Sequence, residues 1–186
     1  NFNHALSQRC YHVQEFSGQV FMMRCKKGFT LLEMLVVVAI IAILATMAVP
    51  YYLSSLAKDQ VKESLVLVEQ LKLPVESYQQ ANGKLPPNNL EAGIPEAKKL
   101  LGNYVESIEL EDGAFHIAFG NKAVKLLQGK FLTVRAITVT GSPDSPMSWL
   151  CGYSAVPMGM EAAGKNKTSV EPKGLLPLAC REMKGK

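Results

Sequence analysis

The chain has 186 residues, of which 48% are hydrophobic and 19% are charged, so it can form one modest folded domain and its composition excludes a disordered protein. The net charge is +4, but residues 1–28 contain four basic residues and one acidic residue, which leaves the remainder close to neutral. A nearly neutral body argues against strong, nonspecific attraction to nucleic acid or to acidic membrane surfaces.

Residues 1–28 read as a leader rather than as a folded element. Residues 1–21 show neither helical nor strand periodicity, and Met22 or Met23 would be natural starts, so we expect residues 1–21 to be untranslated or dispensable. The leader ends in basic residues and a glycine, namely Arg24, Lys26, Lys27 and Gly28. Its candidate metal ligands match no ligand spacing of a known zinc site, and no metal is predicted there: His4, Cys10 and His12.

Residues 29–49 form an apolar run interrupted only by Thr30, Glu33 and Thr46. A helix of about 20 residues spans about 30 Å, the thickness of the hydrocarbon core of a bilayer. Because the run is apolar on every side, its helix must be buried all round, in lipid or among other helices. The basic residues just before it place that end in the cytoplasm and the C-terminal body outside, by the positive-inside rule.

Glu33 is the one charge in this run, and a charged, unpaired carboxylate in a membrane costs a few kcal/mol. One explanation is local, because a carboxylate near a helix start is favoured by the helix dipole. The other comes from the junction after Gly28, where a cut would leave the apolar run on the product with a free amine on Phe29. In a staggered bundle, Glu33 of one subunit would then neutralise the amine of another and set the register.

The residues around this junction resemble the N-terminus of type IV pilins. The resemblance rests on Lys27 to Glu33 (KGFTLLE), on Met34 to Ala45 (MLVVVAIIAILA) and on Val49 to Tyr52 (VPYY). It implies that a prepilin peptidase cuts between Gly28 and Phe29 and methylates Phe29 to N-methylphenylalanine. A phenylalanine at this place, after a short leader from Met22 or Met23, is similar to the type IVa branch.

Residues 50–81 are predicted to continue the helix past Pro50, with a kink or local loosening there and again at Pro74. Apolar residues recur at intervals of three and four, which is the helical period: Leu53, Ala57, Val61, Leu65, Val68, Leu71, Val75 and Tyr78. A second set lies off this stripe and predicts a further packing partner, namely neighbouring subunits: Leu56, Val66, Leu67 and Leu73. The helix is expected to end near Gln80.

Residues 82–103 have loop chemistry, with clustered Gly, Pro and Asn, and residues 104–186 read as strands and a C-terminal region. Strands are predicted at 104–110, 114–119, 131–140 and 147–153, with a hairpin turn at Glu111-Asp112-Gly113. The predicted fold is α+β: a long N-terminal helix packed on a roughly four-stranded antiparallel sheet. Segments such as Ser148 to Tyr153 and Leu176 to Arg181 resemble the pilin sheet and its C-terminal closure.

Two cysteines precede the apolar run, Cys10 and Cys25, and two follow it, Cys151 and Cys180. If the body is exported, the second pair is expected to form a disulfide, since oxidising compartments preserve such bonds. It would close a loop of about 30 residues and stabilise the fold by about 3–4 kcal/mol. The polar segment 154–174 between these cysteines is the predicted exposed recognition surface.

No catalytic or cofactor site is predicted, so the chain is not expected to be an enzyme. His116 lies in a strand pattern without convergent partners and is interpreted as structural. A nucleic acid partner is not indicated, because the basic residues lack interleaved aromatics and are read as solvated surface: Lys122, Lys125, Lys130, Arg135, Lys165, Lys167 and Lys173.

By its resemblance, the chain is predicted to be a type IVa pilin precursor. It would be a single-pass inner-membrane protein of a Gram-negative bacterium and then a homopolymeric extracellular pilus (fimbrium), with Glu33 and Pro50 as assembly residues. The implied partners are the prepilin peptidase, the pilus assembly machinery and other pilin subunits. Adhesion, twitching motility and DNA uptake are what the family implies.

Three alternatives stay open. A minor pilin or pseudopilin would share the N-terminus, although pseudopilins usually lack a C-terminal disulfide loop such as Cys151–Cys180 would close. A DNA-uptake receptor of the pilus tip would bind DNA tightly and selectively. A membrane-anchored or secreted binding domain would fit the weak signal-peptidase match at Thr46-Met47-Ala48, and its N-terminus would then be Val49.

Overall fold

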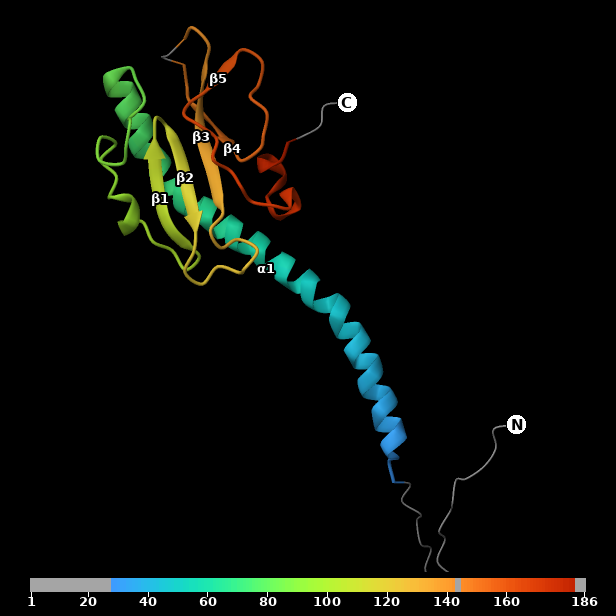
Figure 1. Cartoon of the computed structure of the whole chain (residues 1–186). Coiled ribbons are helices and arrows are strands. Elements are labelled where there is room, and N and C mark those ends of the chain that lie inside the picture. The colour runs from blue at the N-terminus through green and yellow to red at the C-terminus, as the bar shows by residue number, and fades with distance from the viewer. Residues whose placement is uncertain (1–27, 143–144, 183–186) are drawn as a thin grey trace, which may run out of the picture. The chain divides into compact units, whose positions relative to one another are not determined.

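A computed structural model describes residues 28–142 and 145–182 (Figure 1). The first 27 residues, with Arg24, Lys26, Lys27 and the predicted leader start, lie outside the described residues, as do Cys10 and Cys25. Contacts divide the chain within its long helix into two units, residues 1–46 and 47–186, which are described separately.

The structure contains one long helix, three 3₁₀ turns and five strands in the described residues. The helix is α1 (Leu31–Asn82), and the 3₁₀ turns are η1 (Ala97–Lys99), η2 (Lys173–Leu175) and η3 (Leu178–Cys180). The strands are β1 (Val105–Glu111), β2 (Ala114–Phe119), β3 (Phe131–Val139), β4 (Ser148–Cys151) and β5 (Met160–Ala162).

The predicted continuation of the helix is confirmed, because α1 contains both Pro50 and Pro74 and ends at Asn82. One stripe of its second half is buried against the sheet: Ala57, Val61, Val68 and Val75. Two polar residues on the same stripe find partners there. Ser64 donates its hydroxyl to the carbonyl of Val61 at 2.7 Å, and the Gln60 Oε1 accepts the N–H of Val124 at 3.0 Å. The kinks expected at the two prolines remain predictions.

The sheet is antiparallel in the order β1-β2-β3-β4, and one face packs on α1 (Figure 1). Side chains of β2 alternate, so Phe115, Ile117 and Phe119 enter the core with α1. The intervening residues of β2 therefore point to the opposite face, which we call the outer face. The predicted hairpin is confirmed: Asp112 and Gly113 have φ of 49° and 78°, as a tight turn between twisted strands requires.

The connection after α1 is fixed to the sheet by a buried asparagine. The Asn89 amide donates to the carbonyls of Pro95 and Ile108 at 3.0 and 3.1 Å, and its Oδ1 accepts the N–H of Leu110 at 2.7 Å. Asn89 is 6% exposed, so these bonds replace water at a site closed to it. The open edge of β1 is thereby covered by the loop predicted at 82–103.

The prediction of about four strands is confirmed, and a short fifth strand extends the sheet. β5 pairs with β3 on the edge that β2 occupies, beyond the first residue of β2 and opposite β4, with Val139 opposite Met160 and Ile137 opposite Ala162. Three residues provide too little alternation to be recognised as a strand, so β5 arises from pairing with β3 rather than from local propensity.

Candidate functional site

The first turn of α1 is capped by a threonine. The N–H of Glu33 donates to the Thr30 Oγ1 at 3.2 Å, and the N–H of Met34 donates to the Thr30 carbonyl at 3.2 Å. Thr30 is therefore the N-cap, and Glu33 is the acidic residue of the first turn, in the order S/T-x-x-E of a capping box. Sequence reasoning missed this cap, although the pattern Thr30-Leu31-Leu32-Glu33 is the signal that finds it.

The predicted cleavage site lies just before this cap. Gly28, Phe29 and Thr30 precede the helix and are exposed, with no regular secondary structure. Phe29 and Glu33 thus lie at the same end of α1. In the described residues no side-chain cation pairs with the Glu33 carboxylate, so its predicted partner must come from elsewhere.

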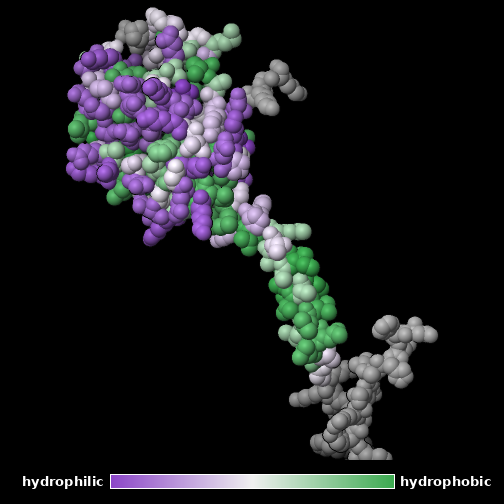
Figure 2. Space-filling model, viewed as in Figure 1, coloured by the Kyte–Doolittle hydropathy of each residue, from purple (hydrophilic) through white to green (hydrophobic). Residues whose placement is uncertain are grey.

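The apolar part of α1 is exposed along its whole length. Large hydrophobic side chains from Leu31 to Val49 are between 40% and 79% exposed. Figure 2 shows hydrophobic residues covering the visible face of this part of the helix. Among the described helices, α1 is the one long and apolar enough to cross a membrane. A surface this apolar needs either lipid or other helices around it.

A smaller apolar set is exposed on the second half of α1. Val66 and Leu73 lie off the buried stripe and are 62% and 68% exposed, whereas Leu67 packs against the core. The prediction that residues off the stripe remain for another partner thus fits Val66 and Leu73, and it is wrong for Leu67. The remaining off-stripe residue, Leu56, is half-buried.

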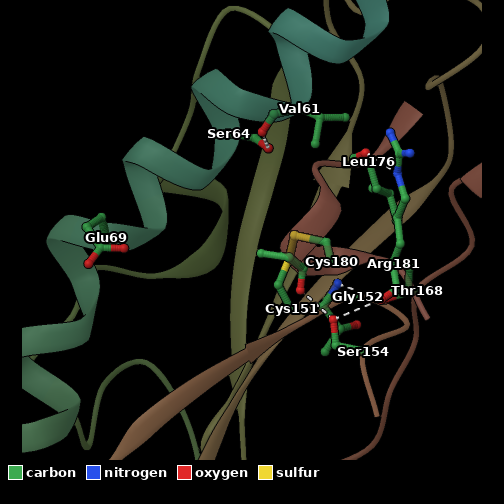
Figure 3. Close-up of a disulfide and its surroundings, with 12 residues drawn as sticks. Val61, Ser64, Glu69, Cys151, Gly152, Ser154, Thr168, Leu176, Cys180 and Arg181 are labelled. Atoms are coloured by element: carbon green, nitrogen blue, oxygen red, sulfur yellow. Dashed lines mark hydrogen bonds between the residues drawn. A yellow bond between two sulfur atoms is a disulfide. The ribbon is translucent and has the colours of Figure 1, made fainter. Parts of the chain in front are cut away.

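The predicted disulfide is present, and Figure 3 shows its surroundings. Cys151 and Cys180 are bonded with their Cα atoms 4.5 Å apart, and Cys180 is buried. The N–H of Tyr153 donates to the Cys180 carbonyl at 2.9 Å, and the Ser154 hydroxyl donates to the Ala179 carbonyl. The bridge therefore fixes the C-terminal region against the end of β4.

The disulfide-closed segment 154–174 is only partly the exposed surface that its composition predicts. Residues 155–159 are exposed, and Met158 projects fully into solvent. The prediction is wrong for Val170, which is fully buried, and for the half-buried Thr168 and Ser169. The reason is that the second half of the segment crosses the outer face of the sheet, where the N–H groups of Phe131 and Thr133 in β3 donate to the hydroxyls of Ser169 and Thr168.

His116 is a buried residue of β2, as its structural interpretation requires. Its Nδ1 lies 3.1 Å from the Thr133 Oγ1, and its Nε2 lies 3.3 Å from the Glu111 Oε2 without the alignment of a hydrogen bond. Burial lowers the pKa of His116, and the neighbouring Lys167 ammonium lowers it further. Within residues 28–142 and 145–182, no cluster of His, Cys, Asp or Glu could hold a metal ion.

The basic residues do not form one free patch. Lys167 is paired with Glu111, and Lys173 is paired with Glu182 at 2.8 Å. Lys173 also lies over the Tyr153 ring, 4.8 Å from its centre. Two of the seven predicted surface cations are thus neutralised locally, which favours the solvated-surface interpretation over a nucleic-acid interface.

Comparison with known proteins agrees with these features. A family described as "Pilin (bacterial filament)" matches residues 57–181, and one described as "Prokaryotic N-terminal methylation motif" matches residues 23–49. The chain is 35% identical to the type IV major pilin protein PilE1 of Neisseria gonorrhoeae over 163 residues, 84% of this chain and 88% of that protein. It is 34% identical to a fimbrial protein of Neisseria meningitidis serogroup B, covering 77% and 83% of the two chains. It is 32% identical to the fimbrial protein EcpC of Eikenella corrodens, covering 79% and 95%. The capped apolar helix, the sheet beside its second half and the C-terminal disulfide are therefore those of a pilin, and the chain belongs to the pilin family.

Proposed function

We propose that this protein is a structural subunit that polymerises into a type IV pilus. The observation that carries the proposal is the exposed apolar surface from Leu31 to Val49 with one carboxylate, Glu33, in its first turn. Such a helix can reside in lipid before assembly and among identical helices afterwards, because both surroundings bury it on all sides. The relatives named as major pilin and fimbrial proteins support a role as the main subunit.

The proposed proteolytic processing takes place just before Thr30, the N-cap of α1. A prepilin peptidase would cut the peptide bond between Gly28 and Phe29, both of which precede the helix. The product would begin with a methylated Phe29, whose amine keeps its positive charge. Glu33 of a neighbouring subunit would neutralise that amine, so a subunit docked in the wrong register would bury an unpaired charge.

The proposed path starts in the inner membrane and ends outside the cell. Residues 29–49 would hold the precursor in the membrane, with residues 50–186 on the extracytoplasmic side, where the disulfide can form. An assembly machinery of other proteins would extract the subunit into the fibre. The completed pilus would support adhesion and twitching motility, the activities typical of such fibres.

The experiment expresses the full chain in a Gram-negative host that supplies a prepilin peptidase and an assembly machinery but lacks its own pilin. Sheared surface fractions are examined by electron microscopy, by intact mass and by N-terminal sequencing. The proposal expects fibres composed of a chain that starts at Phe29 and carries one added methyl group. A surface protein that begins at Val49, or a correctly processed chain that never forms fibres, would contradict it.

A further inference from the structure

The outer face of the sheet is covered by residues 163–169, which we call the cover segment. Its ends are bound to β3, because the N–H of Ala163 donates to the Ala136 carbonyl at 2.8 Å and the N–H of Ser169 donates to the Phe131 carbonyl at 2.9 Å. Between these ends the segment passes directly over β2. A Cβ atom on Gly164 would lie 2.6 Å from the Cβ of Ala114, so the two backbones meet without space for a side chain.

Beneath the cover segment lies His116, with 2% of its surface exposed. One hydroxyl connects it to the segment. The Thr133 Oγ1 accepts the N–H of Lys167 at 3.0 Å and lies 3.1 Å from the His116 Nδ1. In addition, the N–H of Thr133 donates to the Thr168 Oγ1 at 3.0 Å. Since the hydroxyl oxygen already accepts the Lys167 N–H, its own proton is available to the imidazole nitrogen.

This arrangement depends on the imidazole being neutral. A neutral His116 can accept the Thr133 hydroxyl proton at Nδ1, whereas a protonated ring carries N–H groups at both nitrogens. The protonated Nδ1 would compete with the Lys167 N–H for the hydroxyl oxygen, and the hydroxyl proton would lose its acceptor. Protonation therefore weakens the hydrogen bond that holds the middle of the cover segment.

The charges around His116 come from each element packed on it. Glu109 of β1 is its cross-strand partner, and Glu111 of the same strand lies 3.3 Å from Nε2. Lys167 of the cover segment is paired with Glu111, and Lys165 acts on the same carboxylate. On β3, Thr133 is the direct partner of His116 and Arg135 pairs with Ala114, so Arg135 lies on the same face. The two carboxylates favour the imidazolium ion, while Lys167 and burial oppose it.

Burial is the largest of these influences and lowers the pKa of His116, with Lys167 acting in the same direction. The Glu111 pKa is lowered by its hydrogen bond and ion pair with Lys167, so this carboxylate stays ionised well into the acid range. In an opened state His116 would regain its ordinary pKa of about 6.5. The opened state therefore binds the proton first as the pH falls.

We propose that the cover segment is an acid-released latch: it is held over β2 and β3 while His116 is neutral, and it opens when the ring takes up a proton. The inference goes beyond fibre assembly and does not depend on it. For a single linked proton, the opening equilibrium rises at most about tenfold per pH unit below pH 6.5, until the closed form is itself protonated. In acidic surroundings the latch would uncover the outer face of the sheet and change the exposed surface of the protein.

The test is amide hydrogen exchange of the full chain in detergent at pH 7.5 and pH 5.5, with rates corrected for the intrinsic pH dependence of exchange. Peptides covering residues 163–169 are expected to open several-fold more at pH 5.5, while peptides covering α1 from Ala57 to Val75 stay unchanged. Equal corrected rates at both pH values for the cover segment would overturn the proposal.

His116→Gln, which keeps a polar side chain but does not titrate, should abolish the pH dependence of the cover segment. A response that survives in this variant would assign it to another group and overturn the latch. Glu111→Gln should increase the opening at pH 5.5, because it removes a carboxylate that favours the charged ring in the closed state and also removes the ion pair with Lys167. A further test uses the wild-type chain. An NMR titration of the His116 ring must give a pKa below about 6.5, and a higher value would contradict the proposal.

Discussion

Trp149 of β4 donates its indole N–H to the Oε1 of Glu76 in α1, at 2.9 Å. The ring also stacks on Phe115, with centres 5.5 Å apart, and the Lys72 ammonium lies 5.6 Å from the ring centre. Glu76 and Trp149, which are distant in the sequence, thus join α1 to the sheet by a hydrogen bond at the edge of the apolar core. The half-buried indole keeps its hydrogen bond while most of its surface packs in the core.

Glu76→Ala is expected to lower the free energy of unfolding by about 1–2 kcal/mol, because it removes a hydrogen bond to a charged acceptor at a partly buried donor. Unfolding can be followed by the fluorescence of Trp149, the only tryptophan in the chain. Glu69→Ala is the control, since the Glu69 side chain is 69% exposed and its ion pair with Lys72 should contribute less than about 1 kcal/mol. An equal loss in both variants would mean that the indole bond contributes nothing specific.

Asn89→Ala should be among the most destabilising polar substitutions, by about 2–4 kcal/mol. It leaves the carbonyl of Ile108 and the N–H of Leu110 without their partner at a buried strand edge. Asn88→Ala is the control, because Asn88 is exposed and its side-chain oxygen accepts the N–H of Glu91 at the surface. Urea unfolding of both variants measures the difference, and a similar small loss for the two would refute the anchoring role of Asn89.

Replacing both cysteines by serine should lower the free energy of unfolding by about 3–4 kcal/mol, the value for closing a loop of about 30 residues. The effect on the C-terminal region should be more specific than the effect on overall stability. The hydrogen bonds from Tyr153 and Ser154 to the C-terminal region depend on the bridge between Cys151 and Cys180. Hydrogen exchange at residues 175–182 should therefore increase more than exchange in β1 and β2, and uniform loosening would argue against a local anchor.

The elements that were predictable are those whose signal is local. The period of three and four along α1 continues past Pro50 and Pro74, and packing on the sheet supports the helix around Pro74. Asp112 and Gly113 identify their turn because few residues tolerate positive φ. The disulfide followed from the expected export of Cys151 and Cys180, and the bond is present.

The features that sequence reasoning did not reach depend on contacts between distant segments. In the sequence, Asn89 does not differ from the other asparagines of its loop. Its anchoring role arises from hydrogen bonds to Ile108 and Leu110 of β1. The cover segment is polar and glycine-containing, so it reads as exposed. Residues 164–167 are exposed, but the segment is held against the outer face because the hydroxyl and the N–H of Thr133 provide hydrogen-bond partners for it. Composition indicates whether a segment tolerates exposure, but it does not reveal which other part of the fold will face that segment.

Glu33→Gln should separate membrane insertion from assembly. The variant keeps the shape of the side chain and removes the charge, so the apolar run should insert at least as well as in the wild type. Fibres should be strongly reduced, because the amine of Phe29 in a neighbouring subunit would be buried without a counter-ion. Glu33→Asp retains the charge and should assemble better than Gln. Membrane fractionation and counts of sheared fibres measure the two steps, and normal piliation by the Gln variant would reject the register role of Glu33.

Two glycines with similar backbones allow the close approach of the cover segment to be tested. Gly164 and Gly159 both have positive φ, 60° and 79°, so alanine is strained at either position by about 1 kcal/mol. Only at Gly164 would the new Cβ collide, lying 2.6 Å from the Cβ of Ala114 and 2.9 Å from the Glu111 carbonyl oxygen, whereas nothing lies within 4 Å at Gly159. Gly164→Ala should therefore cost clearly more stability than Gly159→Ala and should speed exchange at residues 163–169. Equal effects of the two substitutions would mean that the segment is not held against β2.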